Sequence, residues 1–100
     1  MEQELLLFYE YNHGEFFERT LANILDAEYQ LNMKLKLYKR VTLNDFFECL
    51  GLPFIEYGDD VGWYLDTDIR PNAWISFDRE FVELEDGMEC YIINLPQMSI

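Results

Sequence analysis

The most regular pattern of apolar and polar residues predicts one long helix over residues 15–37. Apolar side chains recur at intervals of three, four and seven residues, which places one stripe on Phe17, Leu21, Ile24, Leu31 and Leu35. Glu28 interrupts that stripe, and the apolar residues at every second position over residues 29–37 would equally suit a strand. Strong helix formers over residues 20–29 and the absence of turn residues favour the helix.

A second, shorter helix is predicted to begin after Thr42 and to end at Gly51. The Thr42 hydroxyl can accept a hydrogen bond from the backbone N–H of Asp45, as in a capping box. The apolar residues of this segment fall on one face, formed by Leu43, Phe46, Phe47 and Leu50. Gly51 suits the left-handed conformation that ends many helices, and Pro53 cannot continue one.

The remaining apolar runs are short and are separated by turn residues. Residues 1–12 fit either a helix or a buried strand, and their leucines and acids favour a helix capped by Gly14. Four strands are predicted, at residues 61–65, 73–78, 81–85 and 88–95. Asp86-Gly87 predicts a hairpin turn before the last strand. That strand is apolar on both faces, which predicts a central position in a sheet that a helix covers on one side.

Together these elements predict an α+β fold in a single domain over residues 1–100. One long and one short N-terminal helix would pack on a small, mostly antiparallel sheet of three to four C-terminal strands. The conformation of residues 1–14 stays open. The sequence contains no repeat, low-complexity segment or linker that would divide it.

The charge of the chain is far from zero. Twenty acids against seven bases give a formal net charge of −13 and a pI near 4.1. Such a chain repels phosphates and anionic membrane surfaces, so we expect no direct binding to nucleic acid or membrane. It would instead be attracted to a partner protein with a basic surface. The alternative, that the acids serve only solubility, stays open.

The sequence predicts no metal, no cofactor and no catalytic residue, and therefore no enzyme. Cys49 and Cys90 lie in apolar runs, which indicates buried and unreactive thiols in a reducing compartment. Sequence distance alone does not exclude that Cys49 or Cys90 is a nucleophile paired with His13. The acids near Asp59 lack the spacing of a calcium loop. The basic stretch at residues 34–40 suits either a phosphate site or, as we prefer, a helix C-terminus.

Several motifs, taken in order, carry a resemblance to a known group of proteins. They are Asp26-Ala-Glu-Tyr-Gln-Leu-Asn32, Val41-Thr-Leu-Asn-Asp-Phe-Phe-Glu-Cys-Leu-Gly-Leu52, Gly58-Asp-Asp-Val-Gly-Trp63, Trp74-Ile-Ser-Phe77 and Asp86-Gly-Met-Glu-Cys-Tyr-Ile-Ile93. The set resembles a family of small uncharacterised proteins of bacteriophages and bacterial mobile elements. The resemblance covers residues 22–95, and the glycine expected near the end of the first helix is replaced by Tyr38-Lys-Arg40. It implies a phage-like origin and transfers no activity.

The functional hypothesis is an acidic phage-type accessory protein that binds a basic protein surface in the cytoplasm of the host cell. In its sharpest form the protein mimics nucleic acid and inhibits a host defence or nucleic-acid-binding complex. The acids expected to contact the partner are Asp59, Asp60, Asp66, Asp68, Glu85 and Asp86. The alternative is a structural, assembly or self-oligomerising protein without catalytic activity. The oligomeric state is not predicted.

Overall fold

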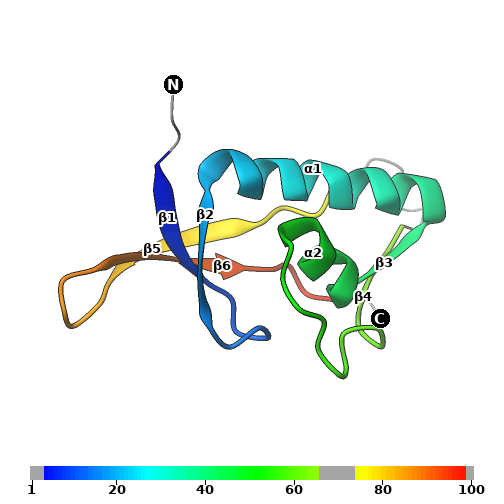
Figure 1. Cartoon of the computed structure of the whole chain (residues 1–100). Coiled ribbons are helices and arrows are strands. Elements are labelled where there is room, and N and C mark those ends of the chain that lie inside the picture. Colours follow the sequence, from blue (N-terminus) through cyan, green and yellow to red (C-terminus); the bar gives the residue numbers. More distant parts are fainter. Residues whose placement is uncertain (1–3, 66–73, 99–100) are drawn as a thin grey trace.

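In the computed structural model, which describes residues 4–65 and 74–98, six strands and two helices follow one another along the chain (Figure 1). They are β1 (Leu5–Tyr9), β2 (Phe16–Thr20), α1 (Leu21–Tyr38), β3 (Arg40–Thr42), α2 (Leu43–Leu50), β4 (Gly62–Tyr64), β5 (Asp78–Glu83) and β6 (Glu89–Asn94). Helices and strands are both present, as expected of an α+β fold. The expected arrangement, N-terminal helices followed by C-terminal strands, is wrong because strands occur throughout the chain.

Four of the strands form one sheet in the order β2-β1-β6-β5, and β3 pairs with β4 in a separate two-stranded sheet. Neighbouring strands are antiparallel except β1 and β6, which run parallel with Phe8 opposite Tyr91. The inner position predicted for the last strand is therefore confirmed for β6. The hairpin turn predicted at Asp86-Gly87 is also confirmed, since it joins β5 to β6 and the Gly87 N–H donates to the Leu84 carbonyl.

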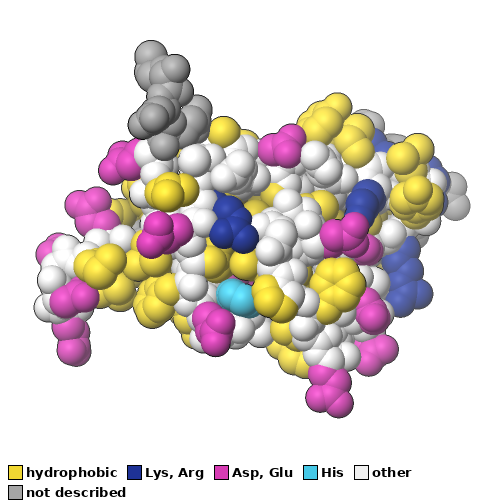
Figure 2. Space-filling model, viewed as in Figure 1, with side chains coloured by type: hydrophobic (Ala, Val, Ile, Leu, Met, Phe, Trp, Pro, Cys, Tyr) yellow, Lys and Arg dark blue, Asp and Glu magenta, His cyan; other side chains and the backbone are white. Residues whose placement is uncertain are grey.

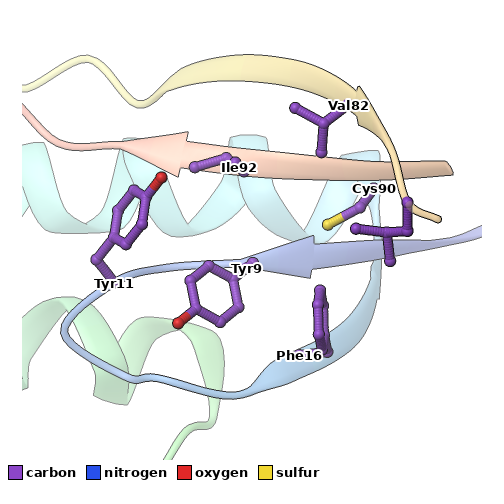
Figure 3. Close-up of a pocket in the computed structure, with 7 residues that line it drawn as sticks. Tyr9, Tyr11, Phe16, Val82, Cys90 and Ile92 are labelled. Carbon is purple, nitrogen blue, oxygen red and sulfur yellow. The ribbon is translucent and has the colours of Figure 1, made fainter.

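The two faces of the four-stranded sheet have different surroundings. The inner face, defined by Phe8 and Phe17, packs in one apolar cluster with side chains of α1 and α2. Contacting rings continue this face across all four strands. Their centroid distances are 5.9 Å for the stacked pair Phe17–Phe8, 5.8 Å for the tilted pair Phe8–Tyr91 and 5.5 Å for the edge-on pair Tyr91–Phe81. The outer face carries the alternate side chains. Both helices lie behind the sheet when it is seen from the outer face (Figure 3).

The N-terminal region corrects two expectations. Residues 5–9, expected to be helical, form β1, and residues 16–20, expected to open the long helix, form β2. The two strands pair over five residues each, which buries Phe8 and Phe17 together, and this pairing outweighs the helical spacing of Phe17. The turn between them is held by Glu10, whose buried carboxylate accepts from the Asn12 amide (2.6 Å) and the His13 N–H (2.8 Å).

The helix α1 begins at Leu21 because Thr20 and Asn23 form a reciprocal capping box there. Farther along, Glu28 and Asn32 hold the segment Trp74–Phe77. Asn32 accepts from the Ile75 N–H (2.7 Å) and donates to the Ile75 carbonyl (2.9 Å), and Glu28 accepts from the Phe77 N–H (2.9 Å). The strand predicted over residues 73–78 is therefore wrong at residues 74–77, because side chains of α1 take the backbone groups that a neighbouring strand would need. Residue 73 lies outside the described residues.

The second helix confirms its prediction in each local detail. Thr42 and Asp45 form the capping box, and Gly51 ends α2 with φ of 71°. On the first turn, the buried Asn44 accepts from the Ile55 N–H (2.9 Å), and its amide donates to the Ile55 carbonyl and to Asp59. Gly58 lies so close to the Asn44 side chain that any Cβ there would collide with it. The loop after α2 is thus bound to the helix N-terminus.

Candidate interaction surface

Each of the two edge strands of the four-stranded sheet places a glutamate on the outer face and an arginine on the inner face. On β2, Glu18 lies on the outer face opposite Leu7, and the Arg19 guanidinium donates to the Leu50 carbonyl on the inner side (2.9 Å). On β5, Glu80 lies on the outer face opposite Ile92, and Arg79 lines a cavity of the inner face beside Phe8 and Tyr91. Because side chains alternate along a strand, Asp78 also falls on the outer face, whereas Glu83 falls on the inner face with Arg79.

The centre of the outer face is apolar and is hollowed into a shallow pocket (Figure 3). The pocket has a volume of about 120 Å³ and is lined by Tyr9, Tyr11, Phe16, Val82, Leu84, Cys90 and Ile92. Tyr11 and Phe16 are 66% and 52% exposed, so the aromatic wall is open to solvent. Within the described residues, neither tyrosine hydroxyl of the pocket forms a hydrogen bond. An uncovered apolar face with an exposed aromatic wall is a candidate interaction site.

Neither cysteine has the environment of a nucleophile. Cys90, 1% exposed, forms part of the pocket floor, and burial raises the pKa of its thiol. Burial also raises the pKa of the Cys49 thiol, although Lys34 acts in the opposite direction. His13 packs its ring against Phe17 and Phe47, at centroid distances of 5.6 and 5.9 Å. In the part of the chain that the structure describes, no hydrogen bond joins His13 to either thiol.

The acids predicted to contact a partner lie in separate places. Asp59 and Asp60 are exposed in the loop between α2 and β4, and Glu85 and Asp86 are exposed in the turn between β5 and β6. The loop and the turn are well apart in Figure 1, so these two pairs do not form one cluster. Asp66 and Asp68 lie outside the described residues. Across residues 4–65 and 74–98, no three His, Cys, Asp or Glu side chains are placed to hold a metal ion.

In the basic stretch at residues 34–40, the side chains of Lys34 and Lys36 make contacts within the molecule. Lys34 pairs with Glu48 at 3.9 Å, and the Lys36 ammonium lies over the Trp74 ring at 5.4 Å. Lys39 caps α1, with its backbone N–H bonded to the Leu35 carbonyl. These contacts favour the helix-terminus interpretation over a phosphate site. Figure 2 shows acids and no Lys or Arg over the β5–β6 turn, whereas cations are visible at the opposite end of the molecule.

A second apolar strip runs along the solvent side of α1. Its residues are spaced by four, namely Leu21, Leu25, Tyr29, Met33 and Leu37, and all except the half-buried Met33 are exposed. This α1 ridge has Asp26 and Lys36 beside it, so its surroundings carry both signs of charge. It therefore differs from the outer face of the sheet, whose two edges present carboxylates.

Comparison with known families gives one result. The model of a family of unknown function, DUF6353, matches residues 1–99. The chain belongs to the DUF6353 family. The DUF6353 match includes the first residues, which the resemblance described above left out, and its description assigns no activity. No curated protein and no solved structure gives a significant match. Within the described residues of this DUF6353 member, no helix is both long enough and apolar enough to cross a membrane.

Sequence reasoning missed the outer face of the sheet. Its residues come from four strands, and their convergence depends on the parallel pairing of β1 with β6, for which the sequence has no local signal. One signal was available. The run Leu5–Tyr9 is apolar at every position, as expected of a strand with apolar side chains on both faces.

Proposed function

We propose that the protein is a non-catalytic binding module that docks onto a basic surface of a partner protein. The observation that carries this proposal is the distribution of charge on the sheet. Glu18 and Glu80 border an uncovered apolar face to which the described residues contribute no Lys or Arg. With a net charge of −13, the chain is drawn to cationic proteins and repelled by phosphates and anionic lipid.

The narrower form of the proposal is a phage-type accessory protein that acts in the host cytoplasm against a defence or nucleic-acid-binding complex. The resemblance of residues 22–95 to phage proteins supports the origin. The excess of carboxylates supports competition with nucleic acid for a basic groove. In this form, binding weakens steeply as salt increases and is displaced by DNA or RNA.

The test is capture from bacterial lysate at low and high salt, followed by reconstitution with the purified partner. Three doubly neutralised variants change the net charge by the same amount: E18Q/E80Q on the sheet, D59N/D60N in the loop and E85Q/D86N in the turn. We expect capture at low salt, release at high salt and weaker binding by at least one of these variants, with unchanged melting. Absence of any reconstituted complex at either salt concentration would exclude the proposal. Binding whose affinity does not change with salt concentration would exclude mimicry of nucleic acid.

A structural or assembly role is the second candidate, and the uncovered apolar surfaces are the observation that favours it. The outer face of the sheet and the α1 ridge would both be covered if copies of the chain associated. Sedimentation of the purified protein tests this role directly. A closed oligomer at micromolar concentration would support assembly, whereas a monomer would favour the binding module.

A further inference from the structure

We infer that the outer face of the four-stranded sheet binds an amphipathic, basic segment of the partner, whose apolar side chain enters the pocket floored by Cys90. This inference rests on the proposed function and names its site and the chemistry of its partner. The apolar centre, the two bordering acids and the absence of a described cation on this face together define what fits there.

The pocket sets the size of the apolar group. Its volume of about 120 Å³ is close to the roughly 150 Å³ of apolar cavities that accept benzene, so it suits a leucine, isoleucine, methionine or phenylalanine side chain. Tyr9 and Tyr11 form one wall with their rings 5.5 Å apart, and Phe16 lies 5.2 Å from Tyr9. Tyrosine rings offer rigid apolar area, and their free hydroxyls can bond to the partner backbone.

The borders of the face set the charge of the segment. Glu18 lies on one edge strand and Glu80 on the other. Glu18 is paired with Leu7 of β1 and Glu80 with Ile92 of β6, so the two acids lie in neighbouring rows of the outer face. A ligand lying across the pocket thus meets a carboxylate on either side. Lys or Arg residues flanking the apolar anchor would pair with both acids.

The negative charge of the chain also disfavours other occupants of the outer face. A second copy of the chain would bring the same carboxylates face to face and would oppose two net charges of −13. Anionic lipid and nucleic acid are repelled for the same reason. The α1 ridge is a competing apolar surface, but of its residues only Leu21, at one end, lines a pocket of the described residues, and both signs of charge surround the ridge.

The probe is a synthetic peptide of leucine and lysine with its leucines on one helical face, titrated into isotopically labelled protein. A peptide of the same composition in scrambled order is the control. We expect the amphipathic peptide to bind more tightly and to shift the backbone amide signals of Leu7, Tyr9, Val82, Cys90 and Ile92. Equal affinity for both peptides, or shifts confined to α1 or to the β5–β6 turn, would overturn the inference.

Two sets of variants locate the contact. E18K/E80K should weaken binding about tenfold, whereas E56K/D60K, with the same change of charge in exposed loop positions, should weaken it less than about threefold. Tyr11→Ser removes an exposed ring and should weaken binding about fivefold without altering thermal melting. Equal loss in the two charge variants would mean that net charge alone attracts the peptide, and the inference would fail.

The outcome separates this inference from the proposed function. If E18K/E80K and Tyr11→Ser bind the reconstituted lysate partner as tightly as the parent protein, the sheet face is not the site, and the binding function stands. If no partner is reconstituted at all, the binding function fails whatever the peptide does. A dimer whose contacts protect the outer face would show that a second copy of the chain, and not a basic segment, occupies this face, and the inference would fail.

Discussion

The two helices of this small protein are specified in different ways. Every part of α2 is visible in its own eight residues and their neighbours: a reciprocal cap at Thr42, one apolar face, and a left-handed stop at Gly51. The longer α1 has apolar residues on its buried side and along its exposed ridge, and it ends at Lys39 in a left-handed conformation with φ of 66°. Local signals define both ends and the buried face of α2, whereas α1 has a local cap at its start and is positioned by partners distant in the sequence.

Glu28 and Asn32 explain how α1 is placed. Both are polar residues of the helix surface that faces the protein, where apolar side chains would be expected. They bind backbone groups of Ile75 and Phe77, more than forty residues away, and so hold an irregular segment against the helix. The lesson is that a polar interruption of an apolar stripe can be the part that orients the helix.

The largest effect is expected at Asn32. Asn32→Ala would leave the buried N–H and carbonyl of Ile75 without partners and should cost about 2–4 kcal/mol of the free energy of unfolding. Urea denaturation measures the loss. Gln30→Ala on the exposed side of α1, where the amide bonds to Asp26, is the control and should cost about 0.5 kcal/mol or less. A loss below about 1 kcal/mol for Asn32→Ala would remove the distinction between the two helices.

The next effect concerns the loop bound to α2. Gly58→Ala should cost about 2 kcal/mol, because the added methyl group collides with Asn44. In the background of Asn44→Ala, where that side chain is gone, the same substitution should cost much less. A double-mutant cycle by denaturation measures this coupling. Equal costs in the two backgrounds would show that the collision is relieved by movement of the loop.

Substitutions at the C-terminal ends of the two helices should change the stability of the protein in opposite directions. Lys39→Gly should stabilise the protein by about 1 kcal/mol, since glycine adopts the left-handed conformation without the steric cost that lysine bears. Gly51→Ala should destabilise it by about 1 kcal/mol at the corresponding position of α2. Thermal melting of both variants beside the parent tests this. If Lys39→Gly lowers the melting temperature, then α1 depends on a contact of the Lys39 side chain.

The smallest effect is a difference in thiol reactivity. Burial raises the pKa of Cys49 and Cys90 above the usual value of 9.0, so both should be alkylated slowly near pH 8 and faster in urea. Cys90, the more buried, should react more slowly than Cys49 on α2. Above pH 9.0 the unfolded chain releases these protons before the folded one does, so stability should decline as pH rises through that range. Mass spectrometry of alkylated peptides over time distinguishes the two sites.

Prediction from the sequence succeeded where neighbours decide the structure. The cap at Thr42, the stop at Gly51 and the turn at Asp86-Gly87 each depend on a few adjacent residues. It failed at Phe16–Thr20, whose spacing fits a helix but whose burial comes from pairing with β1. It failed again at Trp74–Phe77, whose backbone groups bind side chains of α1.

The candidate surface was beyond sequence reasoning for a related reason. Exposure in loops predicts acids such as Asp59 and Glu85 as contact residues. Glu18 and Glu80 belong to strands, and one of those strands was expected to be helix. Only the register of the sheet shows that both acids border the same apolar face.

The parallel contact between β1 and β6 has a consequence for biosynthesis. These strands are neighbours at the middle of the sheet although residues 10–88 separate them along the chain. While the protein is being translated, the edges of β1 and β5 that β6 will occupy stay vacant until residues 89–94 emerge from the ribosome. Throughout that time the nascent chain carries an unpaired strand edge, to which a chaperone can bind.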